Sequence, residues 1–366
     1  MNAKKKVLVA MSGGVDSSVA ALLLKEQGYD VVGAHMKLWD YVDVGADIFK
    51  DGRCCTIDSV TDCRIVCDGI DAPFYVLNMS KEFKATVIDD FVSEYHKGRT
   101  PNPCVRCNSD VKWNEFLHKA EKIGCDYIAT GHYAIIEQNK SKRWYIRKGI
   151  DGSRDQSYVL WGVTQEALSK TLMPLGNLLK SKVREIAHKH KLRTADKPES
   201  REICFVADNN YRRFLRDWEE KHGSESVPGQ IVHENGEVMG EHDGIAHFTV
   251  GQRKGLGITH PTPLYVQRVE VDTHRVIVGD NDSLFVSNFK ATGINWIGGS
   301  ADNGAFEAEI KIRYLHTPAA GKVTPLSETE ASIVFTEPQR AVTSGQSVVF
   351  YNDDIVLGGG IIDRSD

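Results

Sequence analysis

The chain has 366 residues, of which 41% are hydrophobic and 26% charged, and a formal net charge of −5. This length predicts two or three domains, and the apolar content excludes a disordered chain. No run approaches the ~18 apolar residues of a membrane helix. The basic start MNAKKK leads into a short apolar run that ends in SGGVDSS, so we expect no secretory signal and a cytoplasmic protein.

Strands and helices are predicted to alternate over about the first 135 residues. Short apolar runs predict strands at 4–11, 30–39, 72–79 and 125–134, and helical spacing predicts helices at 17–28, 80–98 and 111–124. This order indicates parallel β-α-β units, hence an α/β fold with a doubly wound parallel sheet. Ligands are then expected beyond the carboxyl ends of the strands. Residues 133–149 are predicted to form an added hairpin.

The second half of the chain has a different pattern. Helices are expected at 181–190 and 209–222, after which alternating strands dominate, at 264–272, 274–280, 306–315, 331–337 and 346–352. Many short strands at this spacing predict a β-barrel or a sandwich. We place the domain boundaries near residues 210 and 280, which gives domains at 1–210, 211–280 and 281–366.

Basic residues are concentrated between positions 140 and 222, where there are 19 Lys and Arg against 11 Asp and Glu. Such an excess in an acidic chain is typical of a surface that faces nucleic acid. It is equally typical of a solvated helical surface, and charge alone does not decide between the two.

The clearest local signal is the string SGGVDSS, residues 12–18, between the first predicted strand and helix. Its glycines let the backbone approach an anion, its amides can form a donor nest, and the helix directs its positive end at the same place. Asp16 is expected to orient this loop or to help hold Mg²⁺. The lysine of a Walker A loop is missing. The alternative is a plain glycine-rich turn with a serine cap.

Eight cysteines occur in the chain, and a static disulfide framework is not expected in a cytoplasmic protein of this size. Cys104 and Cys107 form a C-x-x-C motif, and Cys204 lies in the string ICF. Nearby Arg99, Arg106 and Arg201 would favour thiolates. One of these thiols could hold a persulfide that another attacks. The alternative is that all three are buried structural residues.

The remaining cysteines have less specific patterns. Cys54, Cys55, Cys63 and Cys67 match no standard zinc spacing well, so buried free thiols are expected rather than a zinc clip. Cys125 is expected in the core. His35, His242 and His247 are expected to be structural.

SGGVDSS resembles the pyrophosphate loop of the ATP pyrophosphatases, which cleave ATP to AMP and pyrophosphate. Together with GRTPNP, ATGHYA, RDQSYVLWG, ICF, FTVGQRKGLGI, KIRYLHTP and SGQSVVFY, it makes the chain resemble the tRNA-uridine 2-sulfurtransferases (tRNA-specific 2-thiouridylases) along nearly its whole length. The resemblance implies an adenine-nucleotide hydrolase-like domain, a small central domain and a C-terminal β-barrel. It also implies ATP-dependent 2-thiolation of the wobble uridine of certain tRNAs, by adenylation of the base carbonyl oxygen and sulfur transfer from a cysteine persulfide.

The resemblance also implies roles for individual residues. Cys107 matches the nucleophile and Cys204 the persulfide carrier, with a transient disulfide bond between them. Asn102, Pro103 and Cys104 match the segment that meets the target base. The positions that match ATP contacts are Ala10, Met11, Ser12, Gly13, Gly14, Val15, Asp16, Ser17, Met36 and Gly131. Those that match tRNA contacts are His132, Arg154, Asp155, Gln156, Arg313, Tyr314 and Gln346.

The family commonly has Asp where this chain has Cys104. Three thiolates, from Cys104, Cys107 and Cys204, would suit a [4Fe–4S] cluster that holds an extra sulfide, so cluster and persulfide are alternative sulfur routes. Expected cofactors are ATP and Mg²⁺, and expected partners are tRNA and an upstream sulfur-donor protein, with the free chain a monomer. Two other functions are possible: an ATP pyrophosphatase ligase or amidase acting on a small carboxylic acid, and a non-catalytic RNA-binding or redox module.

Overall fold

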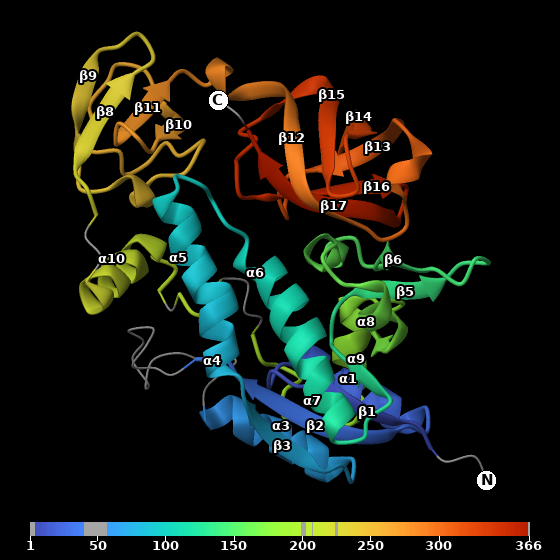
Figure 1. Cartoon of the computed structure of the whole chain (residues 1–366). Coiled ribbons are helices and arrows are strands. Elements are labelled where there is room, and N and C mark those ends of the chain that lie inside the picture. Colours follow the sequence, from blue (N-terminus) through green and yellow to red (C-terminus); the bar gives the residue numbers. More distant parts are fainter. Residues whose placement is uncertain (1–3, 40–56, 199–202, 207, 224–225, 365–366) are drawn as a thin grey trace. The chain divides into compact units, whose positions relative to one another are not determined.

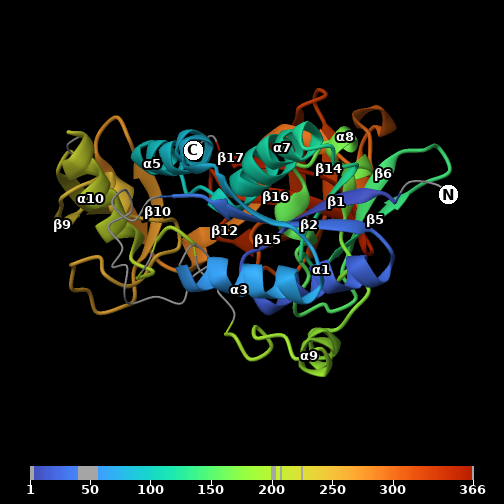
Figure 2. The same cartoon turned by 90° about the horizontal axis from the view of Figure 1, so that it is seen from below.

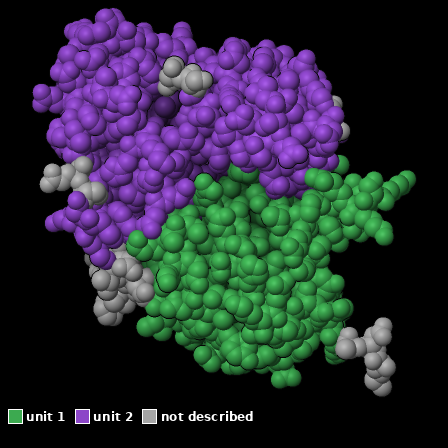
Figure 3. All heavy atoms as spheres, in the orientation of Figure 1, with its two compact units in different colours: residues 1–87, 104–209, 354–356 green, residues 88–103, 210–353, 357–366 purple. Residues whose placement is uncertain are grey.

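The computed structural model describes residues 4–39, 57–198, 203–206, 208–223 and 226–364 (Figure 1). Contacts divide the chain into two compact units (Figure 3). Unit 1 contains residues 1–87, 104–209 and 354–356, and unit 2 contains residues 88–103, 210–353 and 357–366.

A five-stranded parallel sheet forms the centre of unit 1. Its order is β3 (Phe74–Asn78), β2 (Asp30–Lys37), β1 (Lys6–Ala10), β4 (Tyr127–Ala129) and β7 (Thr171–Leu172). The chain moves outward from β1 through β2 to β3, and then returns to the other side of β1 with β4. Strand order therefore reverses between β1 and β4, and in such sheets ligands bind beyond the carboxyl ends at that point. The predicted doubly wound sheet is confirmed.

Helices cover both faces of this sheet. α1 (Val15–Glu26) and α3 (Ile57–Gly69) lie on one face, and α7 (Leu117–Lys122) lies on the other (Figure 2). α9 (Lys180–Lys189) packs against α1 through a shared buried cluster that includes Val19 and Val183. No helix among the described residues is both long enough and apolar enough to span a membrane.

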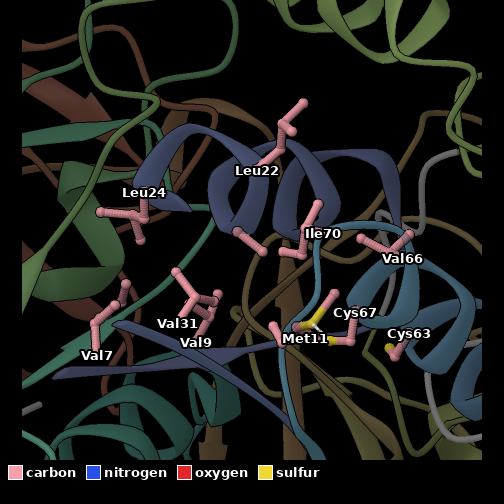
Figure 4. Close-up of a cluster of buried hydrophobic side chains, with 13 residues drawn as sticks. Val7, Val9, Met11, Leu22, Leu24, Val31, Cys63, Val66, Cys67 and Ile70 are labelled. Atoms are coloured by element: carbon pink, nitrogen blue, oxygen red, sulfur yellow. Dashed lines mark hydrogen bonds between the residues drawn. The ribbon is translucent and has the colours of Figure 1, made fainter. Parts of the chain in front are cut away.

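A buried cluster joins α1, α3 and β1 (Figure 4). Val7 and Val9 of β1 are completely buried, as are Cys63 and Cys67 on α3. The Cys67 thiol lies 3.3 Å from the Met11 sulfur, directly after β1. The sulfur atoms of α3 are thus part of the hydrophobic core.

Two predicted helices contain π-helical turns. The first consists of α4 (Ser80–Phe83), a π segment over Lys84–Ile88 and α5 (Asp89–His96). The second begins with α6 (Pro103–Arg106) and a π segment over Cys107–Phe116 before α7. It therefore starts eight residues before the predicted start at 111, because a polar stretch with no apolar repeat precedes that point.

Unit 1 also contains a hairpin and several short elements after β4. β5 (Ala134–Gln138) and β6 (Trp144–Lys148) pair antiparallel, which confirms the predicted hairpin. A 3₁₀ turn, η3 (Ser157–Leu160), and the short helix α8 (Gln165–Ser169) follow.

Unit 2 includes a four-stranded sheet in the order β10-β11-β8-β9. The sequence pattern predicted two of its strands, β10 (Tyr265–Glu270) and β11 (Arg275–Gly279), and missed β8 (Gly229–His233) and β9 (Val238–His242). The predicted helix at 209–222 is α10 (Tyr211–His222), whose Phe214 ring contacts Phe91 of α5 at 5.9 Å.

A closed antiparallel barrel completes the described chain. Its order is β12-β15-β14-β13-β16-β17, and β17 pairs again with β12. Closure distinguishes this barrel from a sandwich, and it removes the exposed sheet edges. The strands are β12 (Phe285–Trp296), β13 (Phe306–Lys311), β14 (Ala319–Pro325), β15 (Glu330–Arg340), β16 (Ser347–Asn352) and β17 (Ile355–Asp363).

Candidate active site

The loop between β1 and α1 has the geometry of an anion-binding loop. Ala10 ends β1, and Val15 begins the 12-residue helix α1. Gly13 has φ of +75°, and a Cβ there would lie 2.7 Å from the Ser59 carbonyl oxygen, so only glycine fits. Because α1 directs its amino end at this loop, the site favours a negatively charged group.

The predicted serines hold the loop in shape. The Ser12 N–H donates to Ser17 Oγ (3.2 Å). Both Ser17 and Ser18 donate their hydroxyls to the Gly14 carbonyl, at 3.2 and 2.9 Å. These bonds wrap the loop around the first turn of α1. Such preorganisation lowers the cost of binding a phosphate.

Asp16 is held by two residues that the sequence did not connect to it. Lys180 places its ammonium nitrogen 2.7 Å from both carboxylate oxygens, and the Tyr133 hydroxyl donates to Oδ1 at 2.7 Å. Lys180 is 7% exposed at the start of α9. Of the two roles predicted for Asp16, these contacts favour orientation of the loop, and they place a buried positive charge beside it.

Met36 and Gly131 lie at the carboxyl ends of strands on either side of the loop. Met36 is the penultimate residue of β2, and Gly131 follows β4. A Cβ at Gly131 would lie 2.8 Å from the Ser17 backbone nitrogen, so this segment packs directly on the loop. His35, also on β2, contacts the Met11 carbonyl through Nδ1 at 3.0 Å. Burial lowers the pKa of His35, which fits the structural role predicted for it.

His132 follows Gly131 and is partly buried. Its Nδ1 is 2.8 Å from Thr130 Oγ1, and its ring lies 5.5 Å from that of Trp113. Burial, with a smaller effect of the Lys112 charge, lowers the pKa of His132 well below its usual value. At neutral pH this ring is therefore an uncharged hydrogen-bonding group.

The RDQ string, predicted to meet tRNA, is a tightly bonded turn. The Asp155 carboxylate accepts from the Gly149 N–H (3.1 Å) and from the N–H and hydroxyl of Ser157. Gln156 and Tyr133 exchange two hydrogen bonds of 3.0 Å, one of them to the Gln156 side chain. The side chains of Asp155 and Gln156 thus hold the turn beside the Gly131–Tyr133 segment. Arg154 is half-buried.

Cys104 and Cys107 lie one turn apart on the same helix, in different environments. Cys104 is exposed in α6, and Cys107 is buried at the start of the π segment. Asn108 donates to the Val159 carbonyl at 2.9 Å and accepts from Lys112 at 2.9 Å. This buried amide ties the helix that contains Cys107 to the RDQSYVLWG segment. Such π turns often occur at functional sites.

Cys204 is a half-buried cysteine in a short turn, and the neighbouring Phe205 anchors that turn. The Val206 N–H donates to the Ile203 carbonyl at 3.0 Å. The buried Phe205 ring packs on Phe83 at 5.7 Å. Phe205 thus fixes the place of the thiol beside it.

The described residues contain no group of three or more His, Cys, Asp or Glu side chains placed to hold a metal. Cys104, Cys107 and Cys204 therefore do not form the three-thiolate site that a cluster needs, and they do not fit a [4Fe–4S] group in this conformation. Arg99, predicted to favour a thiolate, instead pairs with Glu94 and Asp363. Arg201 lies outside the described residues.

The cysteines and histidines that were predicted to be structural are buried wherever the structure describes them. Burial raises the pKa of Cys63 to about 12 and that of Cys67 to about 11, so both are inert thiols in the core. Cys54 and Cys55 lie outside the described residues. Cys125 is buried, as predicted, and His242 and His247, which were predicted to be structural, are buried as well.

Further predicted residues lie in unit 2. Arg313 donates to the Arg340 carbonyl at 3.2 Å, and Tyr314 is 39% exposed with Lys311 over its ring. Gln346 lies within hydrogen-bond distance of the Thr100 and Pro101 carbonyls. These carbonyls immediately precede Asn102 and Pro103, the segment predicted to meet the target base.

Three family models match the chain in succession. They are the tRNA methyl transferase HUP domain at residues 5–208, the tRNA methyl transferase PRC-barrel domain at 216–280 and the aminomethyltransferase beta-barrel domain at 286–362.

Full-length relatives are similar throughout. A tRNA-specific 2-thiouridylase MnmA of Geotalea uraniireducens is 50% identical over 100% of this chain and 96% of its own length. Proteins of the same name from Geobacter metallireducens and Lachnoclostridium phytofermentans are 49% and 48% identical. They match 99% and 98% of this chain, and 98% and 99% of their own lengths.

Proposed function

Because this chain belongs to the family of tRNA-specific 2-thiouridylases, we propose that it forms 2-thiouridine at the wobble position of certain tRNAs by adenylation followed by sulfur transfer. The observation that carries this proposal is the loop of residues 12–18 at the strand-order reversal, together with the partly buried Lys180–Asp16 ion pair. That site suits the phosphates of ATP. In the same unit, Cys107 and Cys204 supply two thiols.

In the first step, the uridine oxygen at position 2 attacks the α-phosphorus of ATP. An oxygen–phosphorus bond forms, the bond to the pyrophosphate oxygen breaks, and pyrophosphate leaves. The backbone N–H groups of residues 12–18 would hold the phosphates, and Lys180 would offset part of their charge. Met36 and Gly131 would line the adenosine, and ATP would enter as its magnesium complex, because Mg²⁺ is usually bound through few protein ligands and the substrate phosphates.

In the second step, sulfur replaces AMP. We propose that an upstream sulfur-donor protein leaves a persulfide on Cys204. Its terminal sulfur attacks C2 of the uracil, a carbon–sulfur bond forms, and AMP leaves with the C2 oxygen. The Cys107 thiolate then attacks the Cys204 sulfur, which forms a Cys107–Cys204 disulfide and releases the thiolated base. An external thiol must reduce this disulfide before the next turnover.

The persulfide route is preferred over a cluster route because the three cysteines are not grouped for metal binding among the described residues. A ligase or amidase acting on a small carboxylic acid would use the same loop, but it leaves Cys107 and Cys204 without a role. The basic stretch at 140–222 would likewise have no partner in such an enzyme.

The proposal is tested by incubating the pure protein with ATP, an unmodified tRNA transcript and a persulfide donor, with and without iron. We expect AMP, pyrophosphate and 2-thiouridine in equal amounts, and no dependence on iron. Cys107→Ser and Cys204→Ser should lose multiple-turnover thiolation, while Cys125→Ala, a buried control thiol, should keep it. If the rate of ATP cleavage does not depend on tRNA, the ligase is supported instead. Full thiolation activity of Cys204→Ser would contradict the persulfide assignment.

A further inference from the structure

Gln346 connects the barrel to a distant backbone segment. It lies in the turn between β15 and β16, and its side-chain nitrogen donates to the Thr100 carbonyl at 3.0 Å and to the Pro101 carbonyl at 3.1 Å. A primary amide has two N–H donors, so both bonds form at once. The two acceptors are the residues directly before Asn102 and Pro103. All of these residues belong to unit 2.

The same segment is held by two further contacts within unit 2. The Thr100 N–H donates to the Ser344 carbonyl at 2.9 Å. The Arg99 guanidinium lies 2.7 Å from Glu94 and 3.0 Å from Asp363. Burial alone would raise the pKa of Glu94, but hydrogen bonds and charge from Arg99 and Lys97 outweigh it and lower that pKa, so the Arg99–Glu94 pair is ionised at neutral pH.

Gln346 is itself fixed in the barrel. Its N–H donates to the Thr343 carbonyl at 3.2 Å, and its carbonyl accepts from the Ile362 N–H of β17 at 2.8 Å. Closure of the barrel by the β12–β17 pairing makes this frame rigid. The Gln346 side chain therefore fixes the backbone of Thr100 and Pro101 relative to the rigid barrel.

We propose that Gln346 is a positioning residue, which sets the backbone of Thr100 and Pro101 so that Asn102 and Pro103 face the target uridine in a fixed geometry. This inference rests on the proposed function, in which those two residues meet the base. It goes beyond the contact with tRNA that the family resemblance implies for Gln346, because the side-chain nitrogen also serves two protein carbonyls in this structure.

The two roles predict different kinetics. Loss of a positioning residue misplaces the reacting groups after binding, and a displacement of about 1 Å can lower the rate about a hundredfold. Loss of a tRNA contact weakens binding instead. The rate of AMP formation at saturating tRNA and the dissociation constant for tRNA separate these effects.

The test uses two variants of similar size, Gln346→Met and Gln346→Glu, neither of which can donate to the two carbonyls at neutral pH. We expect single-turnover AMP formation at saturating ATP and tRNA to fall at least about tenfold, with the dissociation constant for tRNA changed less than about threefold. Gln339→Ala is the matched control, since Gln339 also donates its amide to a barrel carbonyl, that of Glu337, and should keep the wild-type rate. Weaker tRNA binding with an unchanged maximal rate would overturn the inference.

A second measurement needs no tRNA. Hydrogen exchange of the Thr100 amide in the free protein should be at least about tenfold faster in both Gln346 variants than in the wild type, while exchange in the β14–β15 strands is unchanged. Equal exchange at Thr100 in all proteins would overturn the inference even if the wild type thiolates tRNA. If the variants show this faster exchange but the wild-type protein never thiolates tRNA, the proposed function is overturned instead.

Discussion

The ammonium group of Lys180 lies 2.7 Å from each carboxylate oxygen of Asp16, although 163 residues separate the two in sequence. The pair joins the first turn of α1 to the first turn of α9. The loop of residues 12–18 is thus supported from a second helix as well as from its own serines.

Replacing Lys180 with Met should weaken both the fold and the use of ATP. Asp16 would keep only its Tyr133 bond in a partly buried place, and we expect a loss of about 1–3 kcal/mol in unfolding free energy. Loss of a positive charge beside the phosphates should raise the KM for ATP by about tenfold or more. Urea unfolding and initial rates of AMP formation measure the two effects.

Lys182→Met is the control for this prediction. Lys182 lies two residues beyond Lys180 on the same helix, with its ammonium nitrogen 2.7 Å from the exposed carboxylate of Glu185. It should leave both quantities near wild type. A KM for ATP that is the same in both variants would show that Lys180 does not act at the phosphate loop.

Gly13→Ala should abolish ATP-dependent activity while much of the fold persists. The positive φ alone costs about 1–2 kcal/mol for a residue with a Cβ, and here the new methyl also meets the Ser59 backbone at 2.7–2.8 Å. The loop must move, and the phosphate site moves with it. Gly28→Ala is the control, because Gly28 also has a positive φ but no atom within 4 Å of the added Cβ. AMP formation that survives equally in both variants would contradict this account of the loop.

Asn108→Ala should slow sulfur transfer more than adenylation. The change removes the hydrogen bond between the Cys107 helix and Val159, and it leaves a partly buried carbonyl without its donor, at a cost of about 1 kcal/mol. We expect pyrophosphate release to outpace 2-thiouridine formation. Asn114→Ala, at an exposed position on the same helix, should behave as wild type. Equal slowing of both steps would show that Asn108 acts on the whole fold rather than on the thiol.

Acid should destabilise unit 2 through His247. Burial, with Arg216 and Arg212, lowers the pKa of His247 to about 4. An unfolded histidine takes up its proton near pH 6.5, so between about pH 6.5 and 4 the unfolded state binds more protons and stability falls as the pH falls. The loss approaches about 1.4 kcal/mol per pH unit within that window.

Thermal unfolding at pH 7 and pH 5 tests this effect. His247→Gln should show a smaller difference in Tm between the two pH values than wild type. His118→Gln, at an exposed position, should show the wild-type difference. A His247→Gln protein with the full acid sensitivity would exclude His247 as its source.

The sequence predicted the parts of the fold that depend on local pattern. The short apolar run before SGGVDSS and the helical spacing after it were enough to predict β1, the loop and α1. The barrel was predicted less completely, since β17 contains three consecutive glycines and β12 mixes polar and apolar residues, so neither has a clean alternation. The π turns were missed because no repeat in the sequence distinguishes them from α-helix.

The site shows the same limit. Lys180 had no motif of its own, and its pairing with Asp16 depends on how α9 packs against α1. Nothing in the sequence indicates that the side chains of Asp155 and Gln156, which stay predicted tRNA contacts, also bond within the protein. The positions of the Cys104, Cys107 and Cys204 thiols likewise follow from packing, which a single sequence does not specify.

The sulfur-rich core between α3 and β1 bears on chemical selectivity. Under the proposed function, a persulfide on Cys204 must not pass its outer sulfur to the wrong acceptor, and this chain has six cysteines besides Cys107 and Cys204. Cys63 and Cys67 have no solvent exposure and remain protonated at neutral pH, with pKa values near 12 and 11. Because both thiols are buried and protonated, the fold would keep the sulfur of such a persulfide from reaching them.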